Sequence, residues 1–100
     1  MRTLVLHIRT IIVNMQEKKE KFQKLLAETL KNYRENVAKI SISKASDQIG
    51  LTKSVWSNVE AGQRDPQLTT MWRMAESLNV PLSTIIKILE DKLGSDYFLD

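Results

Sequence analysis

Apolar residues recur every three or four positions over most of this chain, the spacing expected of helices that are buried on one side. A first helix is predicted from about Gln16 to Asn36, with apolar positions at Phe22, Leu25, Leu26, Leu30, Tyr33 and Val37. A second is predicted from about Ser41 to Ile49, with Ser41 as its N-cap and apolar or small residues at 42, 45, 46 and 49.

Two further helices follow Pro66. The first has apolar positions at Leu68, Met71, Trp72, Ala75 and Leu78, and Met71 and Trp72 are most simply core residues. Asn79 stands where a left-handed residue can end this helix. The last helix is predicted from about Leu82 to Leu93 and ends at Gly94. A short helix between Gly50 and Gly62 brings the predicted total to five.

The most informative segment lies between these pairs, from Gly50 to Pro66. Thr52 can cap a short helix with its hydroxyl, and Gly62 suits the left-handed residue that ends one. Trp56 and Val59 lie three positions apart on one face of this helix. Gly50 is placed where two helices meet through a tight turn, which often needs a residue at positive φ.

The other face of this short helix is polar and rich in hydrogen-bonding groups. Its residues are Lys53, Ser54, Val55, Ser57 and Asn58. A short polar helix after a sharp turn has the layout of a helix that reads DNA.

The ordered set of motifs resembles the phage-repressor and Cro-like helix-turn-helix family, also called the XRE family. The resemblance covers roughly two-thirds of the chain, from Leu25 to Leu89, and rests on four motifs. They are Gly50-Leu51-Thr52-Lys53-Ser54, the helix end Glu60-Ala61-Gly62, the following Arg64-Asp65-Pro66, and Leu68 through Ala75 to Leu78.

The resemblance implies an all-α, five-helix domain whose third helix enters the major groove of DNA. It places Thr52, Lys53, Ser54, Val55 and Asn58 nearest the base edges, and we expect Ser57, Ser43, Lys44 and Arg64 to complete the DNA-binding surface. The chain departs from the family in two places. Ile42 replaces a glutamine that often touches the DNA backbone, a role that Lys44 or Ser43 can take, and one extra residue lies between Arg34 and Ser41.

The last helix and the residues after it are more apolar than one stripe against a small core requires. We expect a homodimer contact there, formed by Ile85, Ile88, Leu89, Tyr97 and Phe98. The alternative is that the C-terminal residues fold back over their own core.

Residues 1–14 form an atypical leader, which precedes the helix-turn-helix domain of residues 15–94 and a tail of residues 95–100. Positions 4–13 are aliphatic and β-branched, which favours a strand that could pair with its copy across a dimer, although a disordered leader is an equal alternative. The segment is too short for a membrane span, so no membrane association is expected.

Composition adds limits on chemistry. The chain has 100 residues, a net charge of +3, no cysteine, one histidine and three glycines, which leave no thiolate zinc site, histidine cluster or glycine-rich phosphate loop. We therefore expect no enzyme activity, no cofactor and no metal, and a cytoplasmic location. The net charge of residues 1–76 is +5 and that of residues 77–100 is −2, so the positive part contains the predicted reading helix.

The sequence thus favours a transcriptional regulator, most simply a repressor, that binds a pseudo-palindromic operator in double-stranded DNA as a homodimer. The alternative is a protein-interaction module of the antitoxin or adaptor type. A small-molecule sensor is the weakest interpretation, because no ligand-binding domain is evident in the chain.

Overall fold

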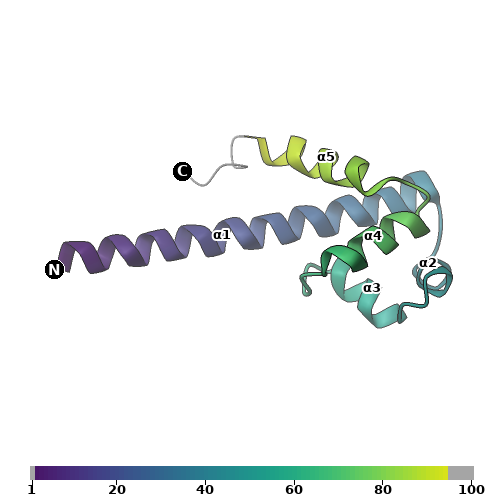
Figure 1. Ribbon diagram of the computed structural model, residues 1–100, viewed down its shortest axis with the longest axis horizontal. Helices are drawn as coiled ribbons and strands as arrows, with labels where there is room; N and C mark the ends of the chain where they lie inside the picture. Colours follow the sequence, from purple (N-terminus) through teal and green to yellow (C-terminus); the bar gives the residue numbers. More distant parts are fainter. Residues whose placement is uncertain (1, 95–100) are drawn as a thin grey trace.

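The computed structural model describes the backbone of residues 2–94 and the side chains of residues 15–94. Its elements are α1 (Arg2–Asn32), the π-helical segment η1 (Tyr33–Ala38), α2 (Ile42–Gln48), α3 (Lys53–Glu60), α4 (Leu68–Ser77) and α5 (Leu82–Leu93). The five-helix, all-α fold is therefore confirmed, with no strand among these residues. Figure 1 shows α2 to α5 gathered at one end of the long α1.

The strand predicted for positions 4–13 is not formed, because these residues lie in α1, which begins at Arg2 rather than near Gln16. The physical reason is that helix nucleation is costly whereas extension is not. Once the packed part of α1 exists, each added residue gains a backbone hydrogen bond, whereas a lone strand would gain none. β-branched side chains oppose this only weakly.

The end of α1 widens into η1, whose six residues carry the chain past the predicted end at Asn36. The carbonyl of Arg34 accepts from the backbone N–H of Lys39 and, at 3.2 Å, from that of Ile40. Lys39 then takes the left-handed conformation, with φ 53°. A π-helical turn takes up more residues than an α-helical one, so it gives room to the extra residue between Arg34 and Ser41.

The predicted helix ends are confirmed at Gly50, Gly62 and Asn79, which all have positive φ. At the end of α3 the backbone N–H of Gln63 donates to Asn58 at 3.0 Å, and that of Gly62 donates to Val59 at 3.1 Å. This pair of bonds satisfies carbonyls that the helix leaves free, and it requires a left-handed residue at Gly62.

Both predicted N-caps are also confirmed. The Ser41 hydroxyl accepts from the backbone N–H of Lys44 at 3.1 Å, and the Thr52 hydroxyl accepts from that of Val55 at 3.4 Å. Each hydroxyl satisfies a backbone donor that has no partner within its own helix.

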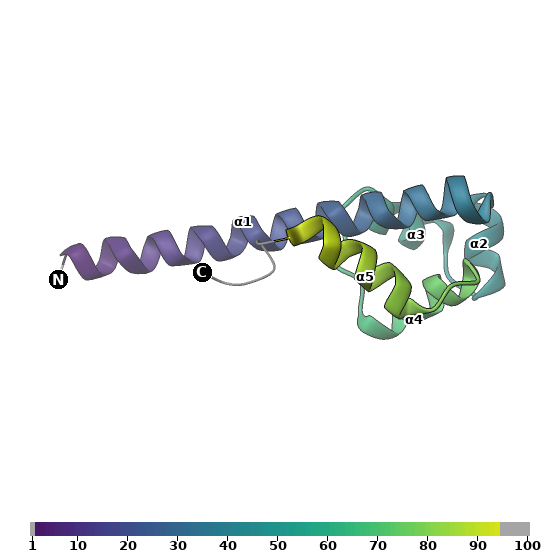
Figure 2. The same cartoon turned by 90° about the horizontal axis from the view of Figure 1, so that it is seen from above.

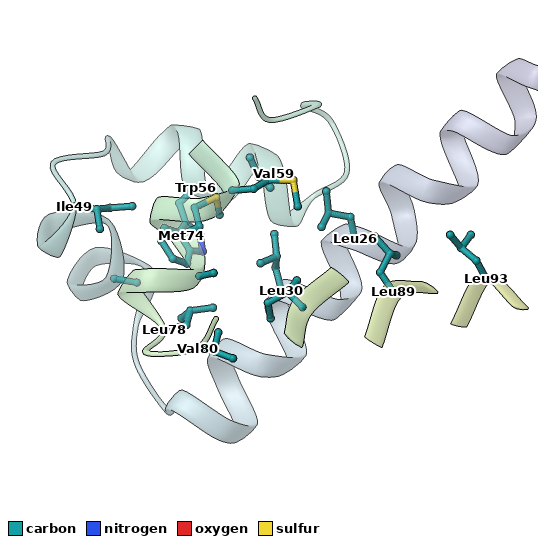
Figure 3. Close-up of a cluster of buried hydrophobic side chains, with 14 residues drawn as sticks. Leu26, Leu30, Ile49, Trp56, Val59, Met74, Leu78, Val80, Leu89 and Leu93 are labelled. Atoms are coloured by element: carbon teal, nitrogen blue, oxygen red, sulfur yellow. The ribbon is translucent and has the colours of Figure 1, made fainter. Parts of the chain in front are cut away.

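The core lies between α1 and the four shorter helices, and Figure 3 shows its side chains. Trp56 at its centre is fully buried. The buried apolar residues are Leu26, Leu30, Ala45, Ile49, Trp56, Val59, Met71, Met74, Ala75, Leu78, Val80, Ile85, Leu89 and Leu93.

Trp72 does not belong to this core, although the sequence favoured it there. Its side chain is 56% exposed, and Leu68, one turn earlier on α4, is 69% exposed. The reason is that α4 turns Met71, Met74 and Ala75 toward the core, which leaves Leu68 and Trp72 on its outer side.

Two of the residues predicted to form a dimer contact are core residues as well. Ile85 and Leu89 are 0% exposed because α5 packs along α1. Figures 1 and 2 show the two helices running side by side in opposite directions. Ile88 is half-buried, and Tyr97 and Phe98 lie outside the described residues. A contact through Ile85 and Leu89 would need the core to open, so the predicted dimer contact of this helix is left with Ile88 among the described residues.

Candidate nucleic-acid interface

Helix α3 is divided sharply between a buried and an exposed side. Trp56 and Val59 are 0% and 1% exposed, whereas Ser54 and Asn58 are exposed and lie one helical turn apart on the opposite side. The exposed side therefore presents a hydroxyl and a carboxamide, which can both donate and accept hydrogen bonds.

The residues predicted around this pair are accessible to different degrees. Thr52 and Lys53 are exposed at the start of α3, and the Thr52 and Ser54 hydroxyl oxygens lie 3.3 Å apart. Val55 and Ser57 are half-buried at the flanks of the exposed side.

The other predicted site residues lie on the neighbouring segments. Ser43 and Lys44 are exposed in the first turn of α2, which packs against α3, and Arg64 is exposed in the loop between α3 and α4. The structure thus places predicted residues on α3 and on the segments before and after it. Ile42, which stands where the family often has a glutamine, instead packs against the core.

A buried ion pair fixes the far end of α3. The Arg34 guanidinium donates to Glu60 through Nε at 2.6 Å and through a terminal nitrogen at 2.9 Å. The same carboxylate accepts from the indole N–H of Trp56 at 2.5 Å. The side chains of Arg34 and Glu60 are only 9% and 5% exposed, so this bidentate pair is shielded from water.

Arg34 also ties this pair to the segment that follows α1. Its remaining terminal nitrogen donates to the Ile40 carbonyl at 2.9 Å, and a weaker contact of 3.4 Å reaches Glu35. The hydrogen bond to Glu60 raises the pKa of Arg34 by more than burial lowers it, so the guanidinium stays charged despite its burial. The network therefore joins α3, η1 and the chain entering α2 into one unit.

Sequence reasoning missed this network, although a signal was present. Arg34 follows Leu26 and Leu30 at four-residue spacing, so a charged residue continues the apolar stripe of α1. A charge at a core-facing position needs a buried partner. The sequence pattern marks Glu60 only as part of the helix end Glu60-Ala61-Gly62.

A second polar contact holds α4 against α2. The Ser77 hydroxyl donates to the Ala45 carbonyl at 2.6 Å and lies 3.1 Å from the Gln48 side-chain oxygen. The two helices before and after α3 are therefore linked directly, which limits the directions in which α3 can move.

Neither a metal-ion site nor a membrane-spanning helix is found among the described residues. Within residues 15–94, the Asp and Glu side chains form no group of three or more that could hold a metal ion. Among the described helices, none combines the length and the apolar character needed to cross a bilayer.

Comparison with known proteins agrees with this geometry. The HTH_3 helix-turn-helix family model matches residues 30–85. The chain is 33% identical over 78 residues to the HTH-type transcriptional regulator SutR of Escherichia coli K12, a match that covers 78% of this chain and 43% of SutR. The crystal structure of an HTH_3 family transcriptional regulator from Vibrio cholerae is 25% identical, with a TM-score of 0.67 over 77% of this chain and 43% of that one.

The chain thus spans less than half the length of either relative. The matched segment contains α2, the turn, α3 and α4, together with the Arg34–Glu60 pair that holds them. On its sequence and its fold, the chain belongs to the HTH_3 family of helix-turn-helix proteins, of the XRE type.

Proposed function

We propose that this chain is a DNA-binding transcriptional regulator that reads the major groove through α3. The observation that carries the proposal is the two-sided character of α3. One side is held by the core and by Arg34, and the other exposes Ser54 and Asn58. A rigidly held helix with free polar groups suits base recognition, because little ordering is needed when it binds.

Each exposed residue has a role that follows from its chemistry. Asn58 can make paired hydrogen bonds to an adenine edge, and Ser54 can bond to any base that offers a partner. Val55 can contact a thymine methyl group. Thr52 and Lys53 reach phosphate or purine acceptors at the start of the helix, and Ser57 lies at its flank.

Phosphate contacts come from the neighbouring segments. Lys44 and Ser43 before the turn, and Arg64 after α3, are exposed and carry charge or a hydroxyl donor. Such contacts set the register of a protein on the duplex and supply much of its affinity without specifying sequence.

We further propose that two copies bind a pseudo-palindromic operator, with one α3 in each half-site. A two-fold dimer presents two identical reading helices, so its site repeats in inverted orientation about one helical turn apart. Repression by occlusion of the polymerase is the simplest result of such binding.

Selection of bound duplexes from a randomised DNA pool tests this proposal. At about 0.15 M salt, non-specific attraction to phosphate is already weakened. The proposal predicts enrichment of an inverted repeat with half-sites about 10 base pairs apart. Binding that fades with added salt without enriching any sequence would contradict it.

A second candidate function is a protein-interaction module of the antitoxin or adaptor type. The observation in its favour is the apolar surface of α4, where Leu68 and Trp72 are both more than half exposed. Failure to enrich any DNA sequence would favour this candidate. Loss of regulation in Trp72→Ser, with DNA binding retained, would show that both functions reside in one chain.

A further inference from the structure

One face of α1 is covered by the rest of the chain at its C-terminal end and becomes uncovered toward the N-terminus. Leu30 and Leu26 are 1% and 2% exposed, whereas Phe22 and Met15 on the same face are 37% and 52% exposed. Figures 1 and 2 show the cause. Helix α5 ends beside the middle of α1, and the N-terminal half of α1 extends beyond every other helix.

The apolar pattern does not stop where the cover stops. Along the sequence, Val5, Ile8 and Ile12 continue the three- and four-residue spacing of Met15 and Phe22, and Lys19 is the one charged residue in this register. Helical periodicity gives these positions the same register on α1 as the uncovered residues. We call residues 2–22 the arm, a segment about 30 Å long at the rise of an α-helix.

The apolar face of the arm offers a partner a surface to bury. The arm extends a helix that is already packed, so it forms at low cost, and β-branched residues such as Val5, Ile8 and Ile12 lower its propensity only slightly. Most helical stability in proteins comes from packing of an apolar face. Met15 and Phe22 on this face are exposed, so a partner that covered it would stabilise the arm further.

We propose that the arm packs against the arm of a second copy of this chain, in antiparallel orientation and centred near Ile12. Charge favours that orientation. Arg2 lies ten residues before Ile12 and Glu20 eight residues after it, and helical periodicity places both on the same flank of the apolar face. An antiparallel pair brings Arg2 of one copy within two residues of the level of Glu20 of the other, about 3 Å along the axis, whereas a parallel pair keeps them about 27 Å apart.

The orientation also suits the proposed function, on which this part of the inference rests. An antiparallel pair has its two-fold axis perpendicular to the helices, so the two α3 helices can face the same side of the dimer.

Cysteine crosslinking tests the orientation directly, because the natural sequence has no cysteine. We expect Ile12→Cys to crosslink with itself under mild oxidation and Val5→Cys not to do so. An equimolar mixture of Val5→Cys and Lys19→Cys should give the mixed dimer, because these positions lie seven residues on either side of Ile12. Efficient self-crosslinking of Val5→Cys would overturn the antiparallel arrangement.

Sedimentation equilibrium without DNA tests whether the apolar face of the arm forms the dimer contact. Ile12→Glu should weaken the dimer by about 100-fold or more, since it places a charge in an apolar contact of both copies. Its matched control is Thr10→Glu, on the opposite face of the same helix, which should leave the dimer unchanged. Circular dichroism of each variant shows whether the domain remains folded.

Two further variants distinguish the arm contact from two alternatives, a dimer formed through α5 and an arm covered by residues 95–100 of its own chain. The dimer should persist in Ile88→Lys and in a chain that ends after Gly94. Loss of the dimer in Ile88→Lys, with Ile12→Glu still dimeric, would assign the interface to α5 and overturn the proposal. A monomeric full-length chain whose arm becomes protease-sensitive only after removal of residues 95–100 would assign the face to the chain's own tail.

These results do not depend on whether the chain binds DNA. A dimer that assembles as predicted but enriches no DNA sequence would contradict the proposed function and leave the arm contact standing. Conversely, a monomer that enriches a single half-site would overturn the arm contact and leave base reading by α3 intact.

Discussion

Arg34 stabilises the position of α3 although it is not part of the exposed side of that helix. Its guanidinium joins the carboxylate of Glu60 to the carbonyl of Ile40, away from the exposed side of α3. A buried ion pair adds little net stability compared with apolar residues of the same size, because both charges lose their hydration. Breaking it is costly, however, because the remaining charge stays buried without a partner.

We predict that Arg34→Met lowers the free energy of unfolding by about 3–5 kcal/mol, since it leaves the Glu60 carboxylate buried and unpaired. Urea unfolding followed by tryptophan fluorescence measures this change. The double variant Arg34→Met/Glu60→Met should recover much of the loss, because no buried charge remains.

The matched control is the exposed pair of Lys87 and Asp91, whose charged atoms lie 3.9 Å apart. Lys87→Met should change the free energy of unfolding by no more than about 1 kcal/mol. A similar small cost for Arg34→Met would show that water reaches the Arg34–Glu60 pair and that it does not hold α3.

At the scale of helices and turns, the features predicted from sequence are those set by local chemistry. Ser41, Thr52, Gly50 and Gly62 act within a few residues of themselves, so their types alone indicate where helices begin and end. The start of α1 and the segment η1 were not predicted, because they depend on packing and on helix extension rather than on local preference.

The same distinction applies to side chains. Helical spacing correctly identified Trp56 and Val59 as buried and Ser54 and Asn58 as outward-facing. Helical spacing alone could not show whether Trp72 is buried, since an apolar residue at the edge of a stripe is buried only when a neighbouring element covers it. Ile85 and Leu89 illustrate the opposite case, because α1 already covers the side of α5 on which they lie.

The cap of α2 gives a prediction for a single element. Ser41→Ala should lower the free energy of unfolding by about 1 kcal/mol, because the backbone N–H of Lys44 loses its partner. Ser43→Ala, two residues later and exposed, should change it by less than about 0.5 kcal/mol. Thermal unfolding of the two variants side by side compares them, and equal midpoints would contradict a capping role for Ser41.

For the whole molecule, charge links the domain to the polyanion that we propose it binds. The chain carries 15 basic and 12 acidic side chains, so its net charge of +3 is modest. Affinity must then come from where the basic groups lie, and Lys44, Lys53 and Arg64 are exposed on or beside α3.

We predict that Lys44→Gln weakens DNA binding about equally for all sequences and lowers the slope of log K against log salt by about one per protomer. The physical reason is that one fewer counterion is released for each phosphate contact that is lost. Fluorescence anisotropy titrations at several salt concentrations measure this slope. An unchanged slope would place Lys44 away from the phosphates.

The proposed function requires the exposed side of α3 to read bases, and substitution of Asn58 tests this requirement most directly. Wild type and Asn58→Ala should be taken through the same selection from a randomised duplex pool, and their enriched motifs compared. We predict that Asn58→Ala loses preference at one base position in each half-site, at a cost of about 1–3 kcal/mol there, and keeps the rest of the motif. Identical motifs for the two proteins would contradict base reading by Asn58 and the orientation of α3 on which the proposed function depends.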